Sequence, residues 1–77
     1  MNFEEEVSNV ISIHPDRLSG KPCFAGTRVP IQNLFDYLEG GETIEDFLDG
    51  FPGVSREQAV TVLELAQQQL TQYLEAA

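Results

Sequence analysis

Residues 20–30 read GKPCFAGTRVP, a stretch with two glycines, two prolines and two of the chain's four basic side chains. Glycine and proline at this density are typical of a chain that turns sharply, because glycine tolerates a positive φ and proline fixes its own φ. We interpret the stretch as a shaped connector, in which Gly26 is predicted to lie at a positive φ. Thr27 is predicted to supply a turn or cap hydroxyl.

Residues before the connector, and its first half, favour extended structure. Val10, Ile11 and Ile13 form a β-prone run that ends at the turn residues 14–16, and residues 21–24 form a second candidate strand. These runs predict a short β arm or hairpin, which needs further packing because two strands alone are barely stable. Residues 1–9, with three consecutive glutamates, are predicted to be an acidic flexible arm, leaving residues 10–77 as a single domain.

The first of three predicted helices follows the connector. Pro30 suits a first helical position, and Thr27 lies close enough upstream to help the start. Apolar residues then recur at i, i+3, i+4 and i+7, which places them on one face. These residues are Ile31, Leu34, Phe35 and Leu38. The pair Gly40-Gly41 is predicted to end this helix.

Two capping boxes mark the starts of the second and third helices. Thr43 precedes Asp46 by three positions, and Ser55 precedes Gln58 by three, so each pair can bond reciprocally. The turn GFPG at 50–53 separates these helices, and the third runs to about residue 75. The predicted fold is mainly α: a three-helix, helix-turn-helix-like domain preceded by the short β arm or hairpin.

The third helix carries a broad apolar stripe along its length. Twenty helical residues span about 30 Å, whereas a 77-residue domain has a radius of gyration near 11–12 Å. The far end therefore has little of the same chain to cover it, and we expect it to pack on another copy or on a partner. The alternative is a frayed, partly exposed end. The residues assigned to this dimer or partner contact are Leu65, Leu70, Tyr73 and Leu74.

The charge balance limits the possible partners. The formal net charge is −9, and basic residues outnumber acidic ones only in the window 14–30. An acidic body repels nucleic acid at long range, so an anion or nucleic-acid contact would have to use that window. No apolar run approaches the roughly 18 residues of a membrane span. An acidic N-terminus and a single cysteine predict a cytoplasmic protein without disulfides.

No residue spacing indicates an enzyme. The chain has one histidine, His14, and one cysteine, Cys23, so neither a metal-ligand set nor a thiol with a nearby base is indicated. His14 is interpreted as a turn residue and Cys23 as a small buried apolar residue. With no phosphate-binding or cofactor motif, the sequence predicts a binding protein without catalytic residues, metal or cofactor.

The motifs along the chain resemble a known family. They are Ile13-His14-Pro15, Gly20-Lys21-Pro22 and GTRVPI at 26–31, followed by Gly41, Ile44 to Phe47 and Phe51-Pro52. This pattern, over about residues 10–68, resembles the family catalogued as domain of unknown function 433. Cys23 stands where that family more often has Val or Ile, and Phe51 stands where it more often has Tyr. The resemblance implies a small VapB-like antitoxin that holds a PIN-like ribonuclease toxin inactive.

The resemblance also suggests a role for the basic residues. PIN-like nucleases bind Mg²⁺ through carboxylates, so the Arg28 guanidinium would fit such an acidic pocket. The structural alternative is that Arg28 bonds helix-terminal carbonyls or pairs with Asp36 or Glu39. Arg17 and Lys21 have the same two interpretations. The predicted partner-binding residues are Arg17, Lys21, Thr27 and Arg28.

A homodimeric DNA-binding regulator is the second predicted function. In a helix-turn-helix the start of the second helix of the motif enters the major groove, where Arg56, Gln58 and Thr61 would contact bases. Four cations per chain are fewer than the roughly 6–10 phosphates that DNA-binding proteins typically neutralise. Operator DNA is therefore expected only as a partner of the dimer or of a complex with a basic toxin.

Overall fold

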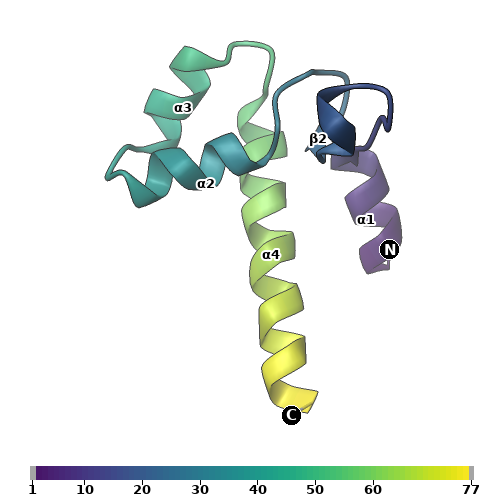
Figure 1. Cartoon of the computed structure of the whole chain (residues 1–77). Helices are drawn as coiled ribbons and strands as arrows, with labels where there is room; N and C mark the ends of the chain where they lie inside the picture. Colours follow the sequence, from purple (N-terminus) through teal and green to yellow (C-terminus); the bar gives the residue numbers. More distant parts are fainter. Residues whose placement is uncertain (1, 77) are drawn as a thin grey trace.

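The computed structural model describes residues 2–76 and is mainly helical, with a small two-stranded antiparallel sheet near the N-terminus (Figure 1). The helices within these residues are α1 (Phe3–Val10), α2 (Gln32–Glu39), α3 (Ile44–Gly50) and α4 (Arg56–Ala76). The strands are β1 (Ile11–Ser12) and β2 (Cys23–Phe24), and a short 3-10 helix, η1, spans Leu18–Gly20. The predicted fold class, mainly α with a short β hairpin near the N-terminus, is confirmed, whereas the helix α1 before the hairpin was not predicted.

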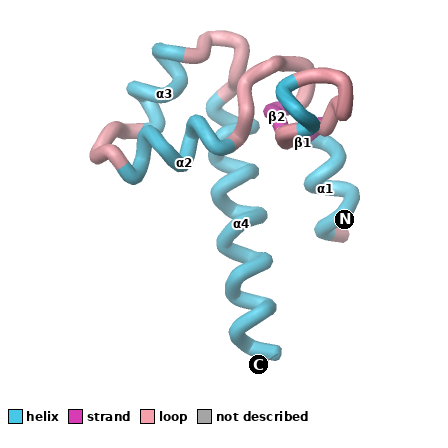
Figure 2. The backbone as a smooth tube through the Cα atoms, in the orientation of Figure 1, coloured by secondary structure: helices cyan, strands magenta, loops and turns pink. Residues whose placement is uncertain are grey.

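The hairpin is short and depends on the helices for its burial. Ile11 pairs with Phe24 and Ser12 with Cys23, and a further antiparallel bridge joins Cys23 to Pro30. Figure 2 shows the two strands joined by a long loop beside the start of α2. Because Phe24 and Cys23 are both buried, the hairpin is anchored through its inner strand.

Both predicted capping boxes are present. The Asp46 amide donates to Thr43 Oγ1 at 3.1 Å, and the Thr43 amide donates to Asp46 Oδ2 at 3.0 Å. At the start of α4, the Gln58 backbone amide donates to Ser55 Oγ, and the Ser55 backbone amide donates to Gln58 Oε1, both at 3.0 Å. These bonds satisfy backbone donors that a helix start leaves open, so local sequence defines where α3 and α4 begin.

The predicted start of the helix that follows the connector is wrong by two residues. Pro30 lies in the extended bridge with Cys23, and α2 begins at Gln32. Thr27 does not help the helix start, since its hydroxyl bonds within the preceding turn. Proline is compatible with both a first helical turn and an extended segment, so its fixed φ did not distinguish them.

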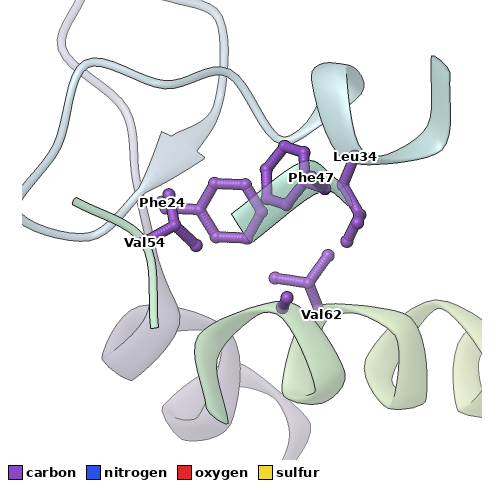
Figure 3. Packing of buried hydrophobic residues seen from close by; sticks show 6 residues of the cluster. Phe24, Leu34, Phe47, Val54 and Val62 are labelled. Atoms are coloured by element: carbon purple, nitrogen blue, oxygen red, sulfur yellow. The ribbon is translucent and has the colours of Figure 1, made fainter. Parts of the chain in front are cut away.

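One apolar core joins the hairpin to α2, α3 and α4. Figure 3 shows Phe24 of β2 and Phe47 of α3 side by side, with Leu34 of α2 next to Phe47 and Val62 of α4 below the two rings. The Phe24 and Phe47 ring centroids are 5.7 Å apart, a separation typical of favourable aromatic pairs. Because all four side chains are almost fully buried, the connector is fixed relative to the helices.

Most of the predicted arm, residues 1–9, is instead helical, since Phe3–Val10 form α1 and pack against α4, and residue 1 lies outside the described residues. Asn2 caps this helix by accepting a 2.8 Å hydrogen bond from the Glu5 amide. Three glutamates occupy its first turn, where carboxylates interact favourably with the helix dipole. The predicted β run also begins one residue later than expected, because Val10 ends α1.

The far end of α4 extends past the rest of the molecule (Figure 1). Leu70, Tyr73 and Leu74 there are 60%, 68% and 63% exposed. Leu65 differs, because it is 4% exposed and lies on the part of α4 that faces α1 and the core. Leu65, which was assigned to the same dimer or partner contact, is therefore largely covered within the chain. None of the described helices is long and apolar enough to cross a membrane.

Candidate functional site

The second half of the connector is a tight turn closed by Thr27. The Phe24 amide donates to the Val29 carbonyl at 3.0 Å, which brings the two ends together. Inside the turn, Thr27 Oγ1 donates to the Phe24 carbonyl at 2.8 Å and accepts from the Val29 amide at 3.1 Å. Gly26 has a φ of 77°, as predicted. Thr27 is therefore a turn residue whose hydroxyl already donates one hydrogen bond and accepts another within the turn.

The loop that leads into the connector, residues 14–21, has an unusual backbone. Leu18, Ser19 and Gly20 have φ values of 51°, 55° and 74°. Left-handed conformation costs a residue with a Cβ about 1–2 kcal/mol. The turn is closed on both sides, because the Arg17 amide donates to the His14 carbonyl at 2.9 Å and the Lys21 amide to the Leu18 carbonyl at 3.1 Å. Strain of this kind is concentrated at functional sites more often than elsewhere.

These two turns bring three of the chain's four cations around one depression. Arg17, Lys21 and Arg28, which we call the basic cluster, line the same small pocket. His14, Leu18, Cys23 and Thr27 complete its lining. The fold thus brings together three of the four residues predicted to bind a partner. The first and last of them, Arg17 and Arg28, are eleven positions apart in an otherwise acidic chain.

The basic cluster is free of the intramolecular pairing that the structural interpretation requires. Within residues 2–76, Arg28 forms no ion pair with Asp36 or Glu39, and the ion pair that is present joins Arg56 to Glu45. Arg28 and Lys21 are exposed and Arg17 is partly exposed. Three uncompensated cations around one depression form a surface suited to an anionic group, and Arg28 can offer two parallel donors to a carboxylate or phosphate.

The pocket itself is too small to enclose a ligand. Its volume is about 10 Å³, roughly the space of one water molecule, against several hundred Å³ for typical small-molecule sites. Cys23 forms part of its lining, buried as predicted, with Sγ 3.5 Å from the Lys21 carbonyl oxygen. No group of residues in the described part of the chain could hold a metal ion. The geometry therefore favours contact with an anionic surface of a larger partner.

The residues predicted to contact DNA bases lie elsewhere and are mostly engaged. Arg56 pairs with Glu45, and its hydrogen bond lowers the pKa of that carboxyl below its ordinary value. Gln58 uses both ends of its amide, accepting from the Ser55 amide and donating to the Ala25 carbonyl. Thr61 is partly buried. The start of α4 thus presents few free donors and acceptors to a base.

An apolar groove between α1 and α4 was not predicted. We call it the α1–α4 groove; it has a volume of about 410 Å³ and continues along the β arm to the start of α2. Its lining residues include Phe3, Val7, Ile31, Phe35, Leu65 and Ala66. Phe3, Val7 and Val10 recur at i, i+4 and i+7, so an apolar helical face was present in the sequence, interspersed with glutamates.

Comparison with known proteins gives a family and a fold. The model of the family described as "Protein of unknown function (DUF433)" matches residues 11–66. The chain is also similar to the crystal structure of a DUF433 member protein from Anabaena variabilis, with 25% identity and a TM-score of 0.70. That similarity covers 92% of this chain and 70% of the other. No curated protein matches the chain significantly.

Proposed function

We propose that this chain, which belongs to the DUF433 family, is an antitoxin-like protein that binds a PIN-like ribonuclease and holds it inactive. Membership alone carries no activity, because the family is described only as one of unknown function. The observation that supports the proposal is the basic cluster: three unpaired cations, held by two tight turns, on a chain whose net charge is −9.

The chemistry of the partner explains why such a cluster would inhibit. A nuclease of this class gathers carboxylates to hold Mg²⁺, and the substrate phosphate must reach that metal. The Arg28 guanidinium would enter the carboxylate pocket and form a bidentate pair, with Arg17 and Lys21 beside it. The bound cation then occupies the place where metal and phosphate meet.

The acidic remainder of the chain would act at longer range. Residues 31–76 carry nine acids against Arg56 alone. An RNA-binding surface on the nuclease must be positive to attract phosphate, so an acidic body complements it and speeds association. The cluster and the body therefore address two surfaces of opposite charge on one partner.

The test is inhibition of any PIN-like ribonuclease that is encoded beside this protein's gene. Arg28→Ala is expected to raise the concentration needed for half-inhibition about tenfold or more, since a tenfold loss corresponds to 1.4 kcal/mol. Arg56→Ala is the matched control, because it removes one guanidinium that already pairs with Glu45. It should leave inhibition within about twofold.

Two results would contradict the proposal. The first is wild-type protein that does not bind or inhibit the nuclease. The second is an Arg28→Ala variant that inhibits as well as Arg56→Ala does, which would remove the cluster from the mechanism. If the free protein instead binds its own promoter DNA strongly and in a salt-sensitive way in a band-shift assay, that result would support the DNA-binding regulator.

A further inference from the structure

The α1–α4 groove and the exposed end of α4 are complementary features of one chain. The groove is lined almost entirely by apolar side chains, and nothing in the described residues fills it. Next to it, Leu70, Tyr73 and Leu74 lie at i, i+3 and i+4 of α4 and are each at least 60% exposed. That spacing is typical of the anchor residues of a helix that binds in an apolar groove.

The charge distribution favours a second copy as the occupant. Residues 66–74, AQQQLTQYL, form an uncharged run in a chain that carries seventeen charged side chains, four basic and thirteen acidic. Glu64 and Glu75 flank the run, and at 3.6 residues per turn each lies about 160–180° around the helix from Tyr73. Two acidic copies can therefore meet along this strip without bringing like charges together. A basic partner would gain nothing from an uncharged strip.

The same geometry favours an antiparallel arrangement. Tyr73 and Ala66 are seven positions apart, about two turns, so they share one face of α4. In an antiparallel pair centred between residues 69 and 70, the bulky Tyr73 lies opposite the small Ala66, which lines the groove. A parallel pair would place Tyr73 against Tyr73 and leave both grooves unfilled.

We propose that two copies associate through antiparallel α4 helices, each seating its Tyr73 over Ala66 of the other and its Leu70 and Leu74 along the α1–α4 groove. The contact forms twice by symmetry, which is the usual arrangement of a homodimer. It uses none of the basic cluster. Failure of this proposal would therefore leave the ribonuclease proposal untouched, and each has its own measurement.

Sedimentation equilibrium of the purified chain tests the association. Wild type is expected at twice the 8.6 kDa chain mass at about 100 μM, well above a micromolar Kd. Tyr73→Lys is expected to sediment as a monomer with unchanged helical circular dichroism, because Tyr73 is exposed in the single chain. Gln68→Lys adds the same charge on the opposite face of α4 and should remain dimeric.

A monomeric wild type at that concentration would overturn the proposal, and so would a Tyr73→Lys variant as dimeric as wild type. If Tyr73→Lys loses helical signal, Leu70→Lys makes the same test one turn earlier. Orientation is checked by mild oxidation. Ala66→Cys mixed with Tyr73→Cys should form a mixed disulfide, whereas strong self-crosslinking of Ala66→Cys would contradict the antiparallel order.

Discussion

Gln58 Nε2, in the first turn of α4, donates a 3.0 Å hydrogen bond to the carbonyl oxygen of Ala25, thirty-three positions earlier. The amide of Ala25 in turn donates to the Val10 carbonyl at 2.8 Å, at the end of α1. The turn that carries Arg28 is thus tied to two helices through one residue. The position of the basic cluster depends on α4 although no cluster residue belongs to it.

The oxygen and the nitrogen of the Gln58 side-chain amide have separable roles. Gln58→Glu keeps an oxygen for the Ser55 amide but replaces the donor to Ala25 with a carboxylate facing a carbonyl. We expect this change to lower the free energy of unfolding by about 1 kcal/mol or more, the cost of a partly buried acceptor left without its donor. Thermal unfolding at pH 7 measures it.

Comparison with a second variant isolates that contact. Ser55→Ala removes the cap and should cost about 1 kcal/mol while leaving the Ala25 bond in place. Gln58→Glu alone is expected to weaken inhibition of the nuclease as well as stability, because the turn that carries Arg28 loosens. Equal effects of Ser55→Ala and Gln58→Glu on inhibition would contradict the coupling.

Gly26 is the second position that fixes the turn. Its φ of 77° favours glycine, and nothing lies within 4 Å of where a Cβ would stand, so the cost of substitution is conformational rather than steric. Gly26→Val should destabilise the protein by about 2 kcal/mol or more, because a β-branched residue at positive φ is strongly disfavoured. Gly26→Asn, which tolerates this conformation, should retain most of the stability. Equal melting temperatures for the two variants would exclude this explanation.

Local sequence predicted α3, α4 and the turn at Gly26 because each has a short-range cause. Capping boxes act over three residues, and glycine at positive φ acts at one position. Thr43 with Asp46 and Ser55 with Gln58 needed no knowledge of the rest of the chain. The clustering of Arg17 with Arg28 could be anticipated only as a window of positive charge, since the two tight turns that bring them together depend on the whole loop.

Residues whose placement depends on distant packing were predicted less well. The glutamates of α1 suggested a solvated arm and masked its apolar face, but the helix is stabilised by the contact of that face with α4. The same contact explains Leu65, which was assigned to a dimer or partner contact and which the fold buries. The direct bonds of Gln58 to Ala25 and of Arg56 to Glu45 are likewise tertiary.

Acid is expected to weaken the start of α3. The hydrogen bond from the Thr43 amide holds the pKa of Asp46 below its ordinary value. The carboxylate therefore stabilises the fold above its unfolded-state pKa, and this contribution is lost as the pH falls through the lower folded-state value. Asp46→Asn should melt below wild type at pH 7 and together with it near pH 2. An unchanged difference at both pH values would show that ionisation is not involved.

Salt should affect the two proposed interfaces in opposite directions. The α4–α4 contact is uncharged but joins two acidic chains, so screening of their repulsion should tighten the dimer as NaCl rises. The contact of the basic cluster with nuclease carboxylates is an attraction between opposite charges, which the same salt weakens. Sedimentation of the chain alone and titration calorimetry with the nuclease, at about 0.05 M and 0.5 M NaCl, measure the two Kd values. A dimer that weakens in salt would mean that charged groups carry it, against the proposed Tyr73 contact. A nuclease complex unaffected by salt would mean that apolar surface, and not Arg28 with its neighbours, carries the inhibition.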